Sequence, residues 1–433
     1  MRVYYHTFGC KANQYDTERM RQEGEARGAR STTSWLDAEV CVVNTCTVTN
    51  QADAQARRFI RRLHRENPDA RVVVAGCSAA LKASMYESLD GVAGVVEGHD
   101  PVAVALALDP PLPEKPVQIE LRRSLDRMDM EPVGGEILRH RQGATRGWLK
   151  IQDGCDRKCS FCATRLARGP SRSRDPEEVV REAAQLARHH PELVITGIHI
   201  GHFGLDLDPH WSLSRMLAHL LERVPDVRFR LGSVEATEVD DLLLELMETS
   251  GGRVAPHLHM PLQSGADPVL RRMRRWHTRE MYRSRTLEIC DRMGSMGLGA
   301  DVITGFPGET ADDHAQTVAL VEELPFTYLH VFPYSPRDGT AAATGSDPVP
   351  QRISGERSRE LRTLAQEKGS RYREGRVGEE ARVVLEGDAA LTGDYLRVGW
   401  EGPRPEETGV FSATLQGSGE HLYIAWSRDS SLN

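Results

Sequence analysis

Short apolar runs alternate with helix-patterned segments over about the first hundred residues, and each run ends at a cysteine. The runs VYYHTFGC, AEVCVVNTC and ARVVVAGC close at Cys10, Cys46 and Cys77, and a helical pattern follows each of them. This alternation predicts a parallel sheet with crossover helices. Sites in open α/β sheets form beyond the carboxyl ends of the strands. We therefore predict an N-terminal open parallel α/β sheet domain over residues 1–110, with these thiols, the N-terminal cysteine set, at one edge.

A longer series of strand–helix units begins after a proline-rich, charged stretch at residues 111–141, which we interpret as a linker. Between residues 142 and 372 the candidate strands are WLKIQ, LVITG, RFRLGS, PHLHM, GADVITG and TYLHVF, and a charged trailing helix follows. These units predict a central partial (β/α)6 barrel with its site at the carboxyl ends of the strands. Residues 373–433 contain short alternating runs separated by glycines, which predict a small antiparallel β-barrel. The expected fold class is α/β.

Composition bears on the cellular location of the chain and on the state of its cysteines. No run of 18 or more apolar residues occurs, so no transmembrane helix is expected. The start, MRVYYHTFGC, lacks the layout of a signal peptide, and we expect a cytoplasmic, reducing location. The eight cysteines are then better interpreted as ligands or core residues than as disulfides. A formal charge of −8 gives no support to a generally basic nucleic-acid binder.

Three cysteines with C-x3-C-x2-C spacing follow the first strand of the predicted barrel. They are Cys155, Cys159 and Cys162, the cysteine triplet. A structural zinc site takes four ligands, and His199 or His202 would have to complete one here. Iron–sulfur clusters are held by cysteine thiolates, and a cluster held by only three of them leaves one iron open to an amine and a carboxylate. The isolated triplet favours an iron–sulfur site over zinc.

Motifs around both groups of cysteines resemble those of the radical S-adenosylmethionine methylthiotransferases. The N-terminal motifs are TFGCKANQYDTE, VVNTCTVTNQAD and VVVAGCSA. The central motifs are GCDRKCSFC, ARGPSRSRDPEEVV, LVITGIHIG, LHMPLQSG, RRMRRWHT, DVITGFPGET and HVFPYSPRDGT. The resemblance covers nearly the whole chain, and the C-terminal barrel resembles a TRAM domain. Within the family, GCKANQYDTE and NTCTVTN are most similar to the enzymes that act on N6-threonylcarbamoyladenosine in tRNA.

This resemblance implies two [4Fe-4S] clusters and S-adenosylmethionine as cofactors, with no catalytic residue beyond the cluster ligands. The cysteine triplet would hold the cluster that cleaves S-adenosylmethionine to a 5′-deoxyadenosyl radical, which abstracts hydrogen from C2 of the adenine. The N-terminal cysteine set would hold an auxiliary cluster that presents sulfur, and a second S-adenosylmethionine would supply the methyl group. The implied partners are the anticodon stem-loop of tRNA, an electron donor such as flavodoxin or ferredoxin, and a sulfur donor.

Three further positions lie at predicted strand ends, where they could contact S-adenosylmethionine. Gly197 would let the backbone approach the amino group, although a plain turn explains this glycine nearly as well. Glu235 and Gln263 could reach the ribose or the methionine moiety, or could cap their loops instead.

Arginines form three groups whose roles the sequence leaves open. Arg168, Arg172 and Arg174 follow the triplet and would bind substrate phosphate or neutralise cluster charge. RRMRRWHTR, residues 271–279, combines cations with a tryptophan and is interpreted as an RNA-contacting patch. The arginines of RRFIRRLHR, residues 57–65, either contact RNA or solvate one face of a helix.

The leading functional hypothesis is methylthiolation of N6-threonylcarbamoyladenosine next to the anticodon. The alternatives are the same chemistry on N6-isopentenyladenosine in tRNA or on an aspartate of ribosomal protein S12, and a non-catalytic iron–sulfur RNA-binding protein. The protein substrate is considered because residues 372–433 hold six arginines against eleven acidic residues. An acidic domain is a poor electrostatic partner for a polyanion such as RNA.

Overall fold

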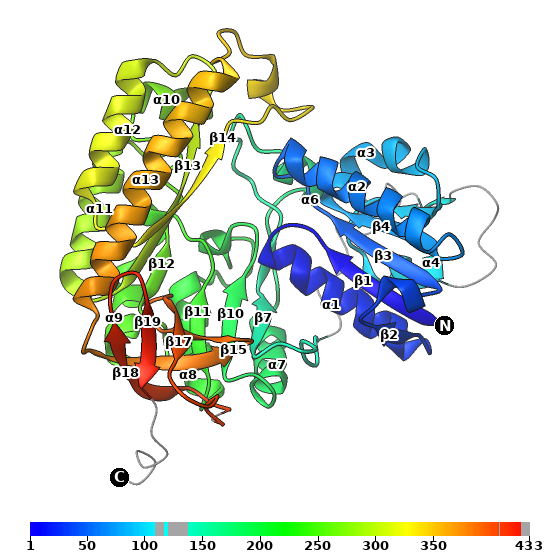
Figure 1. Cartoon of the computed structure of the whole chain (residues 1–433), viewed down its shortest axis with the longest axis horizontal. Coiled ribbons are helices and arrows are strands. Elements are labelled where there is room, and N and C mark those ends of the chain that lie inside the picture. Colours follow the sequence, from blue (N-terminus) through cyan, green and yellow to red (C-terminus); the bar gives the residue numbers. More distant parts are fainter. Residues whose placement is uncertain (109–116, 120–136, 407, 426–433) are drawn as a thin grey trace.

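The computed structural model describes residues 1–108, 117–119, 137–406 and 408–425, and they form three structural units in chain order (Figure 1). Most of the predicted linker, residues 111–141, lies outside the described residues. Within it, Val117–Ile119 form a strand, β6, at the edge of the first sheet. Domain boundaries at residues 110, 141 and 372 therefore stay predictions. None of the helices in the described ranges combines the length and the apolar character needed to span a bilayer.

The N-terminal unit is a parallel sheet with helices on both faces. Its strands are β1 Arg2–Thr7, β2 Arg30–Thr32, β3 Val40–Thr45, β4 Arg71–Gly76, β5 Val92–Val96 and β6, and its helices are α1 Lys11–Ala26, α2 Asn50–Glu66, α3 Cys77–Glu87 and α4 Pro101–Leu108. The order β2-β1-β3-β4-β5-β6 makes β1, β3 and β4 neighbours. Along β3, Val40 and Val42 pack with α1 and α4, whereas Cys41 and Val43 pack with α2 and α3. Both faces of the sheet are therefore buried, as parallel sheets require.

The central unit is the expected partial barrel, and all six predicted strands are confirmed. The strands are β7 Arg146–Lys150, β8 Gln152–Asp153, β9 Arg172–Ser173, β10 Glu192–Thr196, β11 Arg228–Leu231, β12 His257–His259, β13 Gly297–Thr304 and β14 Tyr328–Pro333. Parallel pairing joins β7, β10 and β11 in one sheet and β12, β13 and β14 in another. A parallel bridge between Ser233 and His259 connects the two sheets. Within the described residues β7 and β14 do not pair, so the barrel stays open.

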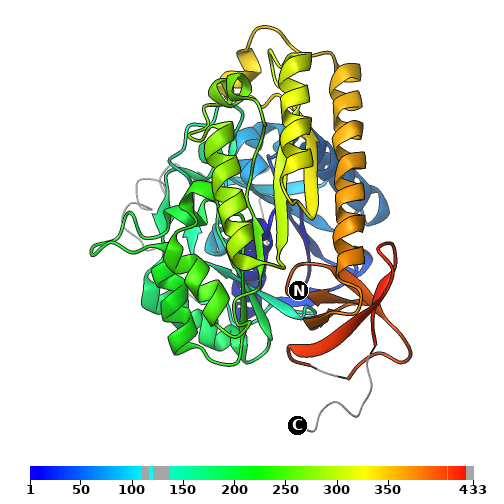
Figure 2. The same ribbon diagram turned by 90° about the vertical axis from the view of Figure 1, so that its left-hand side faces the viewer.

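Helices cover the outside of this barrel (Figure 2). They are α7 Pro176–Ala187, α8 Leu213–Arg223, α9 Asp241–Thr249, α10 Asp267–Met273, α11 Arg279–Met293, α12 Ala311–Glu323 and α13 Gln351–Gly375. The short helix α6, Thr164–Arg168, instead packs against α3 of the N-terminal unit. The predicted trailing helix is α13, which packs along β14. Leu193, Leu217, Leu298 and Leu361 belong to one continuous core between the strands and these helices. Burial of this shared apolar layer is what holds the strands in register.

The C-terminal unit is a closed five-stranded barrel in the order β15-β16-β17-β19-β18, which confirms the predicted small β-barrel. Its strands are β15 Glu380–Glu386, β16 Ala389–Thr392, β17 Arg397–Trp400, β18 Phe411–Gly417 and β19 Leu422–Ala425. Four of its pairings are antiparallel, and β17 closes the barrel by pairing with β19 in parallel.

This small barrel docks against the beginnings of the central strands (Figure 1). Arg146, the first residue of β7, forms an ion pair with Glu386 at 2.9 Å. Arg228, the first residue of β11, donates to the carbonyl of Arg382, and Arg230 donates to the carbonyl of Gly393. The C-terminal unit therefore closes the end of the central barrel that lies opposite the carboxyl ends of the strands.

Candidate functional site

The N-terminal cysteine set lies at one edge of the first sheet. Cys10 is the residue before α1, Cys46 follows β3, and Cys77 begins α3 directly after β4. Because β1, β3 and β4 are neighbours, their carboxyl ends bring the three residues together. The thiol of Cys46 interacts electrostatically with the thiols of both other residues. The sheet thus gathers the three thiols as the strand pattern predicted.

The backbone around these thiols is tightly packed. Gly9 has a φ of 103°, and a Cβ placed there would lie 2.6 Å from Sγ of Cys46. Glycine adopts this conformation readily and leaves room for the sulfur. Asn13 donates from its amide to the carbonyls of Phe8 and Thr45, at 2.9 Å each. These bonds tie the loop that carries Cys10 to the strand end before Cys46.

The cysteine triplet occupies the segment between β8 and α6, at the carboxyl end of β7. The backbone N–H of Cys155 donates to the carbonyl of Gly169 at 3.1 Å, which closes the segment into a loop. Gly154 has a φ of 69°, and a Cβ there would lie 1.8 Å from the carbonyl oxygen of Pro170. Ser160 fixes the middle of the loop, because its hydroxyl donates to the carbonyl of Arg272 at 2.7 Å.

Burial controls the protonation of these thiols. It raises the pKa of Cys46 to about 12 and the pKa of Cys77 to about 11. Burial likewise raises the pKa of Cys155 to about 11, and it raises that of Cys159. These four thiols are therefore neutral near pH 7 when no metal is bound. Metal binding requires thiolates, so it must release protons from these cysteines.

The three positions predicted to contact S-adenosylmethionine follow neighbouring strands at the same end of the barrel. Gly197 directly follows β10, and a Cβ there would lie 2.8 Å from the carbonyl oxygen of Gln152. Glu235 follows β11, is buried, and accepts a hydrogen bond from Arg275. Gln263 follows β12 with a φ of 66° and bridges to β13. The strand ends therefore bring these positions to one place, while their contact with S-adenosylmethionine stays a prediction.

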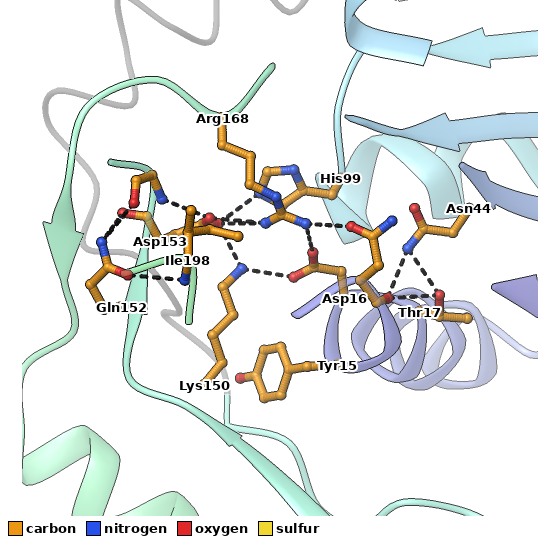
Figure 3. A network of polar contacts seen from close by, with 12 residues as sticks. Tyr15, Asp16, Thr17, Asn44, His99, Lys150, Gln152, Asp153, Arg168 and Ile198 are labelled. Atoms are coloured by element: carbon orange, nitrogen blue, oxygen red, sulfur yellow. Dashed lines mark hydrogen bonds and ion pairs between the residues drawn. The ribbon is translucent and has the colours of Figure 1, made fainter. Parts of the chain in front are cut away.

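A buried polar network between the N-terminal and central units was not anticipated from the sequence (Figure 3). Lys150, the last residue of β7, donates from Nζ to Asp16 of α1 at 2.7 Å and to Asp153 at 2.6 Å. Arg168 binds the same two carboxylates at 2.7 and 2.9 Å. Burial alone would raise the pKa of Asp153, but Arg168 and Lys150 hold it well below its usual range. The charged residues of KIQDG, just before the triplet, indicated a polar site at this strand end. Their partner Asp16 lies 134 positions from Lys150, so the sequence could not identify it.

The structure shows which arginines of these groups have partners inside the protein. Arg174 is fully buried and forms an ion pair with Glu182 at 2.9 Å, so it supports the fold rather than binding phosphate. In the predicted RNA patch, residues 271–279, Arg275 turns inward to Glu235 and Arg279 donates to the carbonyl of Gly265. Arg275 and Arg279 are therefore occupied by contacts within the protein. Arg271, Arg272 and Arg274 of the patch are exposed, so its contact with RNA stays a prediction.

Comparison with known proteins places these features in a family. Residues 2–97 match the family described as Uncharacterized protein family UPF0004, and residues 149–321 match the Radical SAM superfamily. The chain is 36% identical over 386 residues to the protein named Threonylcarbamoyladenosine tRNA methylthiotransferase MtaB of Bacillus subtilis (strain 168), covering 89% of this chain and 84% of that protein. It is 31% identical over 408 residues to the protein named tRNA-2-methylthio-N(6)-dimethylallyladenosine synthase of Bacillus pumilus (strain SAFR-032), covering 91% and 78%.

A solved structure shares the fold. The radical S-adenosylmethionine methyltransferase TsrM from Kitasatospora setae aligns with a TM-score of 0.58 at 16% identity, covering 83% of each chain. The barrel with its cysteine triplet defines a radical S-adenosylmethionine protein. The chain belongs to the radical S-adenosylmethionine methylthiotransferase family.

Membership of this superfamily implies S-adenosylmethionine and an iron–sulfur cluster as cofactors. The residues of the triplet loop fit such a cluster. Their donors are three soft thiols in mutual electrostatic contact, and thiolates are the usual ligands of iron–sulfur clusters. Backbone hydrogen bonds from Cys155 to Gly169 and from Cys162 to Cys159 hold the loop that carries the three thiols.

Proposed function

We propose that this protein inserts a methylthio group at C2 of N6-threonylcarbamoyladenosine next to the anticodon of tRNA. One observation carries the proposal: the relative from Bacillus subtilis, whose name states this substrate, is 36% identical to the chain over 89% of its length. The two groups of cysteines at strand ends supply what the chemistry needs, because radical generation and sulfur delivery require separate metal sites.

In this proposal the cysteine triplet holds one [4Fe-4S] cluster and the N-terminal cysteine set holds a second. When bound, the first would supply one-electron cleavage of S-adenosylmethionine and the second would supply sulfur. Gly197, Glu235 and Gln263 would line the S-adenosylmethionine site. Arg275 fixes the orientation of the Glu235 carboxylate through their ion pair. The C-terminal barrel closes the opposite end of the central strands, which keeps water from that side of the reacting groups.

The proposed chemistry requires further partners. The anticodon stem-loop of tRNA would be the substrate, an electron donor such as flavodoxin or ferredoxin would reduce the first cluster, and a sulfur donor would replenish the second. A tRNA substrate places the enzyme in the cytoplasm.

Two alternative substrates have specific support. Dimethylallyladenosine in tRNA is named for the relative from Bacillus pumilus, at the lower identity of 31%. An aspartate of ribosomal protein S12 would suit the acidic C-terminal unit, because ribosomal proteins are generally basic. The higher identity to the threonylcarbamoyladenosine enzyme favours the first proposal.

The test uses anaerobically reconstituted protein with dithionite, S-adenosylmethionine and tRNA that carries threonylcarbamoyladenosine without the methylthio group. The tRNA is digested and its nucleosides are measured by mass spectrometry. Parallel reactions contain tRNA with isopentenyladenosine, or ribosomal protein S12. A methylthio adduct on threonylcarbamoyladenosine supports the proposal, and modification of either other substrate alone overturns it. A C155A variant is the control, and we expect it to form neither 5′-deoxyadenosine nor product.

A further inference from the structure

Arg168 reaches from the loop of one cysteine group to a thiol of the other. It is the last residue of α6 and lies six positions after Cys162 in the chain. Its side chain is completely buried and points toward the N-terminal sheet (Figure 3). Nε donates a hydrogen bond to Sγ of Cys77 at 3.1 Å. One guanidinium therefore joins the segment that carries the triplet to a sulfur of the N-terminal cysteine set.

The remaining donors of this guanidinium are held by fixed partners. Nη1 donates to both carboxylate oxygens of Asp153, at 2.9 and 3.1 Å. Nη2 donates to Asp16 at 2.7 Å and to Oδ1 of Asn13 at 2.6 Å. Because a guanidinium is planar and presents its donors in a rigid fork, these bonds determine its orientation. The Nε–H is consequently aimed at the sulfur of Cys77.

Four charged side chains of the network balance one another without the cysteines, and the ring of His99 also contacts Asp153, at 2.9 Å. Asp16 and Asp153 carry two negative charges, and Lys150 and Arg168 carry two positive charges. The side chains are at most 4% exposed, so water screens these interactions little. The hydrogen bond to sulfur is thus made in addition to the ion pairs among these four groups, which do not require it.

A hydrogen bond donated to a ligating sulfur changes the properties of the bound metal. It draws charge from the sulfur, which stabilises the reduced state and raises the reduction potential of an iron–sulfur cluster. It also fixes the direction in which the sulfur points. Asn13, which accepts a hydrogen bond from Arg168, also donates to the carbonyls of Phe8 and Thr45. It thereby holds the loops that carry Cys10 and Cys46.

We propose that Arg168 is a positioning residue that couples the two cysteine groups, orienting Cys77 and raising the reduction potential of the cluster held by the N-terminal cysteine set. This inference rests on the proposed function, because that function places a cluster at Cys10, Cys46 and Cys77. The rigid link from Asp153 and Lys150 of the barrel to Asp16 of α1 also keeps the two sites at a constant separation.

The test measures the N-terminal cluster alone, in full-length protein whose triplet is removed by C155A, C159A and C162A. Reconstituted samples carrying R168M or R168K are titrated with dithionite, and the midpoint potential is followed by electron paramagnetic resonance. We expect a more negative potential in R168M, and a smaller shift in R168K, which keeps the charge but loses the fork.

The matched control is R174M. Arg174 is equally buried, and its partners are Glu182, Tyr15 and the carbonyl of Lys150, none of them a thiol. We expect it to lower thermal stability without shifting the potential. In the enzyme with both cysteine groups, R168M should lower the methylthio product formed per 5′-deoxyadenosine by about tenfold or more.

Two results would overturn the inference while leaving the proposed function intact. A cluster that is present in R168M with an unshifted potential would show that the hydrogen bond to Cys77 has no electronic effect. Equal shifts in R168M and R174M would trace the change to loosened packing. A different failure, the absence of iron and sulfide from the parent without the triplet, would remove the N-terminal site and the inference with it.

Discussion

Nδ1 of His199 lies 3.5 Å from Sγ of Cys155. The other ring nitrogen, Nε2, is bonded to Glu238 at 2.8 Å, and His202 stacks on the ring at a centroid distance of 3.9 Å. The ligand atoms of His199, His202 and Glu238 lie within 4.8 Å of one another. His199 therefore contacts one thiol of the triplet, as the fourth ligand of a zinc site would have to.

Replacement of His199 by alanine distinguishes an iron–sulfur cluster at the triplet from a zinc ion. In protein whose N-terminal cysteine set is replaced by alanine, H199A is expected to retain about four iron and four sulfide per chain, because three thiolates hold the cluster. C155A is the control and should lose both. Iron, sulfide and zinc analysis of the reconstituted protein makes the measurement. Loss of a bound zinc ion in H199A, with no iron in the parent, would contradict the iron–sulfur assignment.

Gly154 is expected to tolerate no side chain. A Cβ would lie 1.8 Å from the carbonyl oxygen of Pro170, so G154A must displace the backbone of the triplet loop. The left-handed conformation costs about 1–2 kcal/mol for alanine, and overpacking adds about 1–3 kcal/mol. Gly143 also has a positive φ but has no atom within 4 Å of a Cβ, so G143A should show the conformational cost alone. Thermal unfolding of the two variants tests this, and equal losses would show that the contact is relieved cheaply.

Glu192 is expected to make the docking of the C-terminal barrel sensitive to acid. Burial alone would raise its pKa, but Arg230, Arg228 and Arg146 lower the pKa to about 2. Because the folded-state pKa is depressed, this stabilisation is complete above the ordinary carboxyl pKa of 4.5 and is lost as the pH falls from there toward 2. The shift corresponds to about 3 kcal/mol.

The pH effect is isolated by comparison with E192Q. Thermal unfolding at pH 7 and pH 3 should show a smaller loss on acidification in E192Q than in the parent protein, since glutamine does not titrate. E192Q should also be less stable at pH 7, because it leaves buried arginines unpaired. E356Q, in an exposed pair on α13, is the control and should match the parent. An identical acid response in E192Q and the parent would refute this assignment.

The exposed face of α2 is expected to contribute to tRNA binding. Arg58 and Arg61 lie on that face, and a protein with a net charge of −8 needs a local basic surface to dock a polyanion. R58E with R61E should weaken tRNA binding and reduce the slope of log affinity against log salt by about two. R352E with R359E, at two exposed positions of α13, makes the same change in net charge and is the control. Fluorescence anisotropy at several salt concentrations makes the measurement, and an unchanged slope would exclude this face.

Much of the architecture could be predicted because its signals are local. The six central strands show as short apolar runs, and the cysteines of the first sheet stand at or shortly after strand ends. Elements with weaker patterns were not predicted. β2 and β6 are only three residues long, and β16 consists of the short run Ala389–Thr392. Segments this short carry little periodicity, and they form strands because a neighbouring edge offers hydrogen bonds.

The sequence by itself determined the class of chemistry, because the spacing of the triplet and the position of each cysteine after an apolar run are properties of neighbouring residues. Only the tertiary structure decided which arginines serve the site. Arg168 meets Cys77 across 91 positions of the chain, and Arg275 meets Glu235 across 40. The sequence around an arginine does not show whether its side chain will be buried beside a partner or exposed to solvent. The difference arises when folding removes water from a charge, which then has to be paired with whichever opposite charge the packed strands and helices bring beside it.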